Sequence, residues 1–184
     1  MLTLSLILQL MLTPSGSNMV IFGAQGFGHA CPVRGVILTA EHVTVNNPRG
    51  FYWSDQFKKR GTLTVEALAD PRDIVRLNPA SGSIPAWYVL GWEPQIGDKV
   101  HWLEYNRKDA KHALHPKTVE AGIVNLLGGQ IILSEAPSPG ASGACVLNRT
   151  EEAIGVVAFG LPLDDGSSVL GAVNITEGLD WGVE

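Results

Sequence analysis

Pro139-Gly140-Ala141-Ser142-Gly143-Ala144-Cys145 places a serine between glycines at the head of an apolar run. Glycines let the chain turn tightly, so this stretch can hold a hydroxyl at a surface with backbone N–H groups gathered beside it. Acyl-transfer chemistry uses that arrangement for a nucleophile and an oxyanion-binding site. Small residues also cluster in ordinary turns. The stretch therefore indicates chemistry only if a base and an orienting acid exist elsewhere in the chain.

Short apolar or alternating runs surround this stretch on both sides and predict strands rather than helices. The 21 glycines and 11 prolines among 184 residues suit many short strands joined by turns. A turn is expected at 23–28, a hairpin turn at Gly128-Gly129, and a short helix in the tail after Glu177. The sequence thus predicts an all-β barrel or sandwich, with strands at 19–22, 31–38, 62–68, 74–77, 87–90, 99–105, 118–124, 130–134, 144–147, 153–160 and 168–173.

Composition narrows the class of protein. Apolar residues make up 45% of the chain and charged residues 17%, which is typical of a globular domain. The formal net charge of −5 argues against a nucleic-acid partner, because such proteins normally present a basic face. No run of like charges suggests an interaction tail.

The first residues, 1–12, are strongly apolar but shorter than a membrane-spanning helix requires. They match the apolar core of a secretory signal, although no Lys or Arg precedes them and no clear cleavage site follows. A first strand or short helix packed on the domain is the alternative. Membrane association through residues 1–12 and localisation therefore stay open.

Two cysteines, Cys31 and Cys145, are too few for a disulfide framework. They can form one bridge if their Cα atoms come within about 7 Å. The interpretation we favour from sequence is that both are buried thiols that pack as small hydrophobes. His112 and His115 have the spacing of a metal-binding pair, but no third ligand is evident, so a solvated loop without metal is expected.

Two other residues carry the features of a base and an acid. His42 follows the apolar run 36–38 after a short Thr-Ala-Glu turn. The rigid strand before this turn would hold the imidazole in place. Asp73 directly precedes the alternating run that begins at Ile74. Asp70 precedes Pro71 and suits an ordinary turn aspartate; Asp70 and then Asp55 are the alternatives if Asp73 lies far from His42.

The order His42, Asp73, Ser142 is the order found in chymotrypsin-type proteases. Leu38-Thr39-Ala40-Glu41-His42 resembles the family's Leu-Thr-Ala-Ala-His, Asp73-Ile74-Val75-Arg76-Leu77 its Asp-Ile-Ala-x-Leu, and Gly140-Ala141-Ser142-Gly143 its Gly-Asp-Ser-Gly. The segment 155–160 resembles the hairpin that ends at the family's substrate-binding edge. The resemblance extends from about residue 20 to residue 172 and is closest to the compact bacterial and viral trypsin-like serine peptidases.

The resemblance implies two antiparallel six-stranded β-barrels with the active site in the cleft between them. Residues 19–80 would form the first barrel, with His42 and Asp73, and residues 81–184 the second, with Ser142. The segment 78–85 is the expected linker, and residues 1–18 form an apolar extension. A serine endopeptidase of this kind acts on proteins or peptides and needs no cofactor or metal; its oligomeric state is not indicated.

The same resemblance assigns roles around the triad. The N–H groups of Gly140 and Ser142 would form the oxyanion hole. Five residues would bind the substrate. Ala136 and Pro137 would lie near the base of the substrate pocket, and Ala158, Phe159 and Gly160 would form one of its walls. Since neither of the two positions near the base carries a carboxylate to pair with Lys or Arg, a small or medium apolar P1 residue is expected.

The chain departs from the family pattern at Ala141. Digestive members have an aspartate there that pairs with a newly cleaved N-terminus, so we expect activity that does not depend on such an amine. Two alternatives remain. One is a catalytically inactive trypsin-like homologue that serves as a protein-binding module; the other is an unrelated all-β binding domain.

Overall fold

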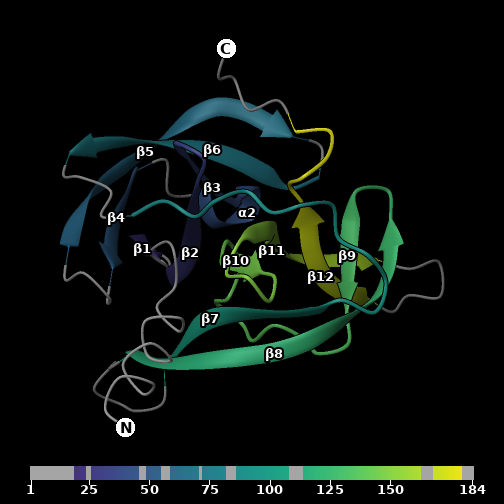
Figure 1. The fold of residues 1–184 in the computed structure, drawn as a ribbon. Helices are drawn as coiled ribbons and strands as arrows, with labels where there is room; N and C mark the ends of the chain where they lie inside the picture. The colour runs from purple at the N-terminus through teal and green to yellow at the C-terminus, as the bar shows by residue number, and fades with distance from the viewer. Residues whose placement is uncertain are drawn as a thin grey trace, which may run out of the picture.

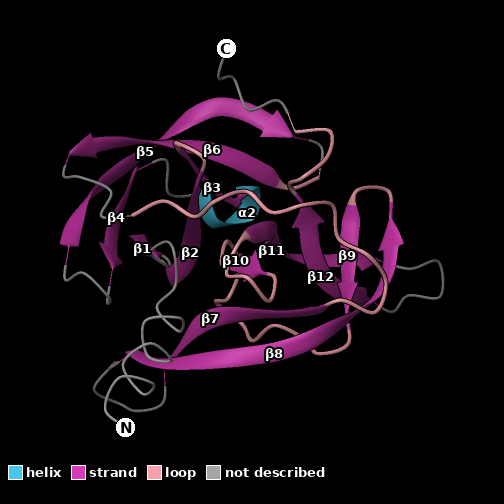
Figure 2. Cartoon of the chain, viewed as in Figure 1, coloured by secondary structure: helices cyan, strands magenta, loops and turns pink. Residues whose placement is uncertain are grey.

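The computed structural model describes residues 19–23, 26–45, 49–54, 59–70, 72–81, 86–107, 114–162 and 168–179. In this part of the chain, strands dominate and one short helix, α2 (Glu41–Thr44), interrupts them (Figure 2). The predicted all-β class is confirmed. The strands are β1 (Met19–Gly23), β2 (Gly26–Val33), β3 (Val36–Ala40), β4 (Arg49–Ser54), β5 (Lys59–Asp70), β6 (Ile74–Ser81), β7 (Lys99–Arg107), β8 (Leu114–Leu127), β9 (Gln130–Leu133), β10 (Cys145–Leu147), β11 (Ala153–Pro162) and β12 (Ser168–Asn174).

The strands close into two six-stranded antiparallel barrels, as predicted (Figure 1). The first barrel has the order β1-β2-β3-β6-β5-β4 and closes where β1 pairs with β4. The second has the order β10-β11-β12-β9-β8-β7 and closes at Leu147 and His101. The predicted apolar extension, residues 1–18, lies outside the described residues.

Two tight turns illustrate how sequence sets the strand boundaries. The hairpin predicted across Gly128-Gly129 is confirmed, and both glycines have positive φ, 55° and 77°. The single strand predicted over 31–38 is wrong, because Arg34 (φ 48°) and Gly35 (φ 82°) turn the chain between β2 and β3. Two consecutive residues with positive φ form the turn that matches the twist of a two-residue hairpin.

The first part of the predicted linker is a strand. Residues 78–81, predicted as part of a linker, continue β6, since the long β5 provides partners such as Leu63 for Pro79. The strand predicted over 87–90 is instead an extended connection with isolated bridges. Tyr88 anchors it to the first barrel by donating its N–H to the Pro32 carbonyl (2.8 Å) and accepting from the Arg34 N–H (3.1 Å).

The two barrels share a hydrophobic interface as well as having separate cores. Met19, Ile37 and Leu63 belong to the core of the first barrel, while Trp102 and Ile131 belong to the core of the second. A third buried cluster takes side chains from both barrels and from the connection between them. Its members include Val33, Leu38, Ile74, Tyr88, Leu147, Val156 and Val173.

A disulfide crosses this interface. Cys31 on β2 and Cys145 on β10 are bonded, with Cα atoms 4.8 Å apart and a sequence separation of 114. The preference for two buried thiols is therefore corrected. Residue composition could not decide between the alternatives, because the pairing depends on how two distant strands meet.

Removing this disulfide should lower stability without changing the fold. A bridge that closes so long a loop restricts the unfolded chain, and its loss typically costs roughly 2–5 kcal/mol. We expect the double variant Cys31→Ala/Cys145→Ala to unfold at lower denaturant concentration than the oxidised wild type. Reductant should shift the wild type by a similar amount and leave the variant unchanged. Two alkylatable thiols in the native, unreduced protein would contradict the bridge.

Candidate active site

His42 and Asp73 lie together because their strands are neighbours. Ala40, the last residue of β3, pairs with Ile74, the first of β6, so the residues just beyond these strand ends meet at the same barrel edge. His42 Nδ1 is 2.6 Å from Asp73 Oδ2, and the His42 backbone N–H donates to Asp73 Oδ1 at 3.0 Å. A carboxylate only accepts, so Nδ1 carries a proton, and in the neutral form of the ring the lone pair is on Nε2.

The backbone at Asp73 is held in an unusual conformation. Its φ of 66° lies in the left-handed region, which aspartate tolerates better than most residues. The Glu41 N–H donates to the Asp73 carbonyl at 3.0 Å, so α2 and the Asp73 turn are connected by three hydrogen bonds. This conformation aims the carboxylate at both the ring and the backbone of His42. Asp55 lies outside the described residues, as does the side chain of Asp70.

Arg72, next to Asp73, ties this turn to the second barrel, a role that the sequence did not indicate. Its Nη1 donates to the carbonyls of Asn174 and Glu177, and its Nη2 to that of Gly178, all at 3.1 Å. These carbonyls lie at and beyond the end of β12. The turn that carries the acid is thus fixed from both barrels.

Ser142 lies on the second barrel directly before β10 and is 3% exposed. Its carbonyl accepts from the His29 N–H on β2 at 2.7 Å, which places the serine at the barrel interface. A Cβ at Gly28 would lie 2.8 Å from Val43 Cγ1 and 3.2 Å from the Ser142 carbonyl oxygen. Val43, which follows His42, and the backbone of Ser142 therefore both lie against Gly28. Between the described residues Ser142 and His42, the structure forms no hydrogen bond.

The loop before Ser142 has two N–H groups that are unused within the described structure. Gly140 has a φ of 92°, and the Ala141 N–H donates to the Ser138 carbonyl at 2.9 Å, which closes a tight turn. Among the described residues, the N–H groups of Gly140 and Ser142 have no acceptor. Two such donors beside a serine are the elements of an oxyanion-binding site.

The glycine after the serine is required sterically. Gly143 has a φ of 90°, and a Cβ there would overlap the carbonyl oxygen of His29. Its N–H donates to the Val157 carbonyl at 2.7 Å. The motif glycine therefore allows the two barrels to approach at the serine.

His29 is a buried residue of this region that sequence reasoning missed. Its Nδ1 donates to the Gly140 carbonyl at 2.7 Å, and its Nε2 accepts from the Tyr105 N–H at 3.3 Å. The Tyr105 ring stacks on the imidazole with centroids 5.9 Å apart. Burial lowers the pKa of His29 from 6.5 to about 4, although the Gly140 bond and the charge of Glu104 raise it in part. The ring is therefore neutral at pH 7.

The predicted substrate-binding residues occupy two segments. Ala136 is exposed and Pro137 is buried in the stretch before the loop. Ala158 is buried on β11 and pairs with Gly171, but the next β11–β12 pair is Leu161 with Val169. The pairing register thus shifts across Phe159 and Gly160, and the side chain of Phe159 lies outside the described part.

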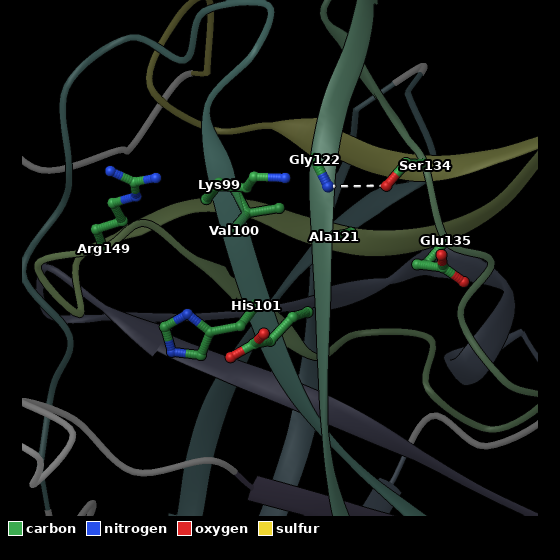
Figure 3. Close-up of a pocket in the computed structure, with 9 residues that line it drawn as sticks. Lys99, Val100, His101, Ala121, Gly122, Ser134, Glu135 and Arg149 are labelled. Carbon is green, nitrogen blue, oxygen red and sulfur yellow. Dashed lines mark hydrogen bonds between the residues drawn. The ribbon is translucent and has the colours of Figure 1, made fainter.

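A separate pocket of about 510 Å³ lies on the second barrel (Figure 3). None of the predicted site residues lines it. Lys99, His101 and Arg149 contribute its basic groups, and His101 Nε2 is 3.0 Å from Glu151 Oε1. The pocket is therefore distinct from the site at the barrel interface.

The remaining candidates concern metals and membranes. Among the described residues, no three His, Cys, Asp or Glu side chains group as a metal site requires. His112 and the side chain of His115 lie outside those residues. The described segments also contain no helix with the length and apolar character to cross a membrane.

Comparison with known proteins gives a structural likeness but no sequence relative. No family model and no curated protein matches the chain. A human pathogenic astrovirus serine protease superposes with a TM-score of 0.63 at 22% identity, covering 89% of this chain and 91% of that one. The MamO protease domain from Magnetospirillum magneticum gives a TM-score of 0.67 at 12% identity, with coverages of 89% and 94%.

A third neighbour is an inactive mutant form of Rv3671c from M. tuberculosis. It has a TM-score of 0.67 at 17% identity and covers 89% of this chain and 83% of that one. At such identities the likeness establishes the fold. This chain has the chymotrypsin-like two-barrel fold.

The buried His29 predicts a pH dependence of stability. Because its pKa is near 4 when folded and 6.5 when unfolded, the unfolded chain binds an extra proton between these values. Stability should fall as the pH drops from about 6.5 towards 4, by on the order of 3 kcal/mol from this residue. His29→Gln, which cannot titrate, should show a shallower decline in denaturant unfolding across this range. Equal pH slopes for variant and wild type would contradict the assignment.

Proposed function

We propose that the chain is a trypsin-like serine endopeptidase that uses His42 as general base, Asp73 as orienting acid and Ser142 as nucleophile. The observation that carries the proposal is the pair of hydrogen bonds between Asp73 and His42. In addition, Val43, which follows His42, and the Ser142 backbone both pack against Gly28. The shared fold with several serine proteases gives further support.

The chemistry follows from these positions. A serine hydroxyl attacks a peptide carbonyl poorly unless a base takes its proton, and the Nε2 lone pair of His42 is that base. As the Ser142 Oγ–C bond forms, the carbonyl oxygen becomes an oxyanion, which the N–H groups of Gly140 and Ser142 bind. His42 returns the proton to the leaving amine. Water, deprotonated by His42, then releases the acyl group and regenerates Ser142.

Asp73 acts through His42. Its bond to Nδ1 selects the tautomer with the lone pair on Nε2 and stabilises the imidazolium that forms during attack. The bond from the His42 N–H to Oδ1 holds the carboxylate in place. A hydrogen bond from the Ser142 hydroxyl to His42 Nε2 is expected to form when substrate binds, because such contacts are often too long in free enzymes.

The triad can be tested with a fluorophosphonate probe, which bonds to an activated serine and releases fluoride. We expect labelling of the wild type and its loss in Ser142→Ala and His42→Ala. Asp73→Asn should keep the fold but lower kcat by about 10⁴, because the amide favours the wrong imidazole tautomer. His101→Ala, on the distant pocket, is the matched histidine control and should be labelled normally.

The alternative function makes the opposite prediction in the same experiment. A catalytically inactive homologue that binds proteins would leave Ser142 unlabelled in the folded wild type. Labelling that persists in Ser142→Ala would mean that another serine is the nucleophile.

We further propose that the enzyme prefers a small or medium apolar P1 residue. The stretch proposed as the pocket base, Ala136-Pro137, has no carboxylate to pair with Lys or Arg. The edge at Ala158, Phe159 and Gly160, where the β11–β12 register shifts, would receive the peptide as an added strand. The substrates are therefore extended protein or peptide segments.

Peptides that differ only at P1 will check this preference. Hydrolysis of the Ala and Val peptides should exceed that of the Arg and Lys peptides in kcat/KM. Faster cleavage after Arg would contradict it, whereas the triad assignment would stand.

A further inference from the structure

We propose that Glu104, on β7, is a positioning residue that holds the oxyanion loop, residues 138–142, in its active form together with His29. This inference rests on the proposed function and explains how the loop keeps its shape when Ala141 supplies no anchoring side chain. Neither Glu104 nor His29 touches the proposed reacting atoms. Both act through the backbone of the loop.

Glu104 is the one buried carboxylate among the described residues, with no exposed surface. Its Oε1 accepts from the Ser138 hydroxyl at 2.6 Å, and its Oε2 accepts from the Ser138 N–H and from Trp102 Nε1, both at 3.1 Å. Burying a carboxylate is costly unless donors surround it, and an apolar side chain would fill a barrel without that cost. Two of these three hydrogen bonds come from Ser138, the first residue of the loop.

Ser138 connects Glu104 to the rest of the turn by hydrogen bonds. Its carbonyl accepts from the Ala141 N–H at 2.9 Å, while the Gly140 carbonyl accepts from His29 Nδ1 at 2.7 Å. The N–H and the C=O of the Gly140–Ala141 peptide are therefore both bound. Because a peptide unit is planar, two bonds fix the orientation of this plane.

The fixed peptide lies between the two that carry the proposed oxyanion donors. The Gly140 N–H belongs to the peptide before it and the Ser142 N–H to the peptide after it. On the far side, the Ser142–Gly143 peptide is also bound at both ends, by the His29 N–H and the Val157 carbonyl. The N–H groups of Gly140 and Ser142 thus have no acceptor among the described residues, while the peptides beside them are fixed by hydrogen bonds.

The supports come from both barrels and meet next to each other. Tyr105 follows Glu104 on β7, donates its N–H to His29 Nε2 and stacks on the His29 ring. One strand therefore supports the loop directly through Glu104 and indirectly through His29. Ala141, which is 1% exposed, packs in the core of the second barrel and leaves the anchoring to these residues.

The test compares Glu104→Gln with the wild type on a peptide ester and on the matching thionoester, whose sulfur is poorly accepted by oxyanion donors. A glutamine must turn its NH₂ group towards one of the donors that now face the carboxylate, which loosens the loop. We expect kcat for the ester to fall roughly 10- to 100-fold, less than the roughly 100- to 1,000-fold that follows from losing an oxyanion donor outright, because the donors are loosened and not removed. KM should change little, and the preference for ester over thionoester should shrink.

Two further variants separate positioning from folding. Ser138→Ala removes the shortest bond to Glu104 without placing anything new in the core, and it carries the test if Glu104→Gln does not fold. The double variant should be no worse than Glu104→Gln alone, since both act through one contact. Asn148→Ala is the matched control, because Asn148 is also buried in the second barrel and its Oδ1 also accepts three hydrogen bonds, but these come from Thr150 and Glu152 rather than from the loop. It should lower the melting temperature and leave kcat and the ester preference unchanged.

The outcomes distinguish this inference from the function on which it rests. An active wild type with Glu104→Gln and Ser138→Ala folded and equal to it in kcat and ester preference would overturn the positioning role alone. An equal loss in Asn148→Ala would also overturn it, because the effect would then follow stability. A folded wild type that neither labels at Ser142 nor cleaves the ester would overturn both.

Discussion

The fixed interface between the two barrels is the constraint on which the rest of the structure depends. Of the residues in the proposed triad, His42 and Asp73 lie next to strand ends of the first barrel and Ser142 lies shortly before a strand of the second, so neither barrel holds all three. A shift of about 1 Å between catalytic groups can cost a large part of an enzyme's rate. The interface is accordingly held by apolar packing, a disulfide, and hydrogen bonds from His29 and Arg72.

These contacts combine two kinds of interaction. The shared apolar cluster supplies most of the association energy but has no preferred direction. Hydrogen bonds to buried carbonyls and a covalent bridge are directional, and a buried donor left without its acceptor costs about 1–3 kcal/mol. His29 therefore does more than fill space: its two bonds to the carbonyls of Gly140 and Ser142 fix the register in which the barrels meet.

The sequence predicted the features that local patterns encode. Alternation and turn residues gave the strands and the all-β class, and the residues around His42 and Asp73 were recognisable because each lies beside its own strand. The break at Arg34-Gly35 was missed since only one of its two residues is glycine, and the end of β6 was missed because pairing with β5 overrides the polar composition of 78–81. The disulfide was not the favoured alternative, and His29, Arg72 and Glu104 were missed, for one reason. The partners that give these residues their roles lie from 34 to 114 residues away, and only the closed barrels bring them together.

Arg72 has a consequence for the order in which the site is completed during synthesis. The chain emerges from the ribosome from its N-terminus, at about 5–20 residues per second, and domains generally fold as they appear. The first barrel is available early, yet the three carbonyls that bind Arg72 belong to Asn174, Glu177 and Gly178. A nascent chain that lacks these residues holds the turn at Asp73 from one side only. The left-handed backbone at Asp73 thus gains its second support only after residues more than 100 positions beyond Arg72 have been translated.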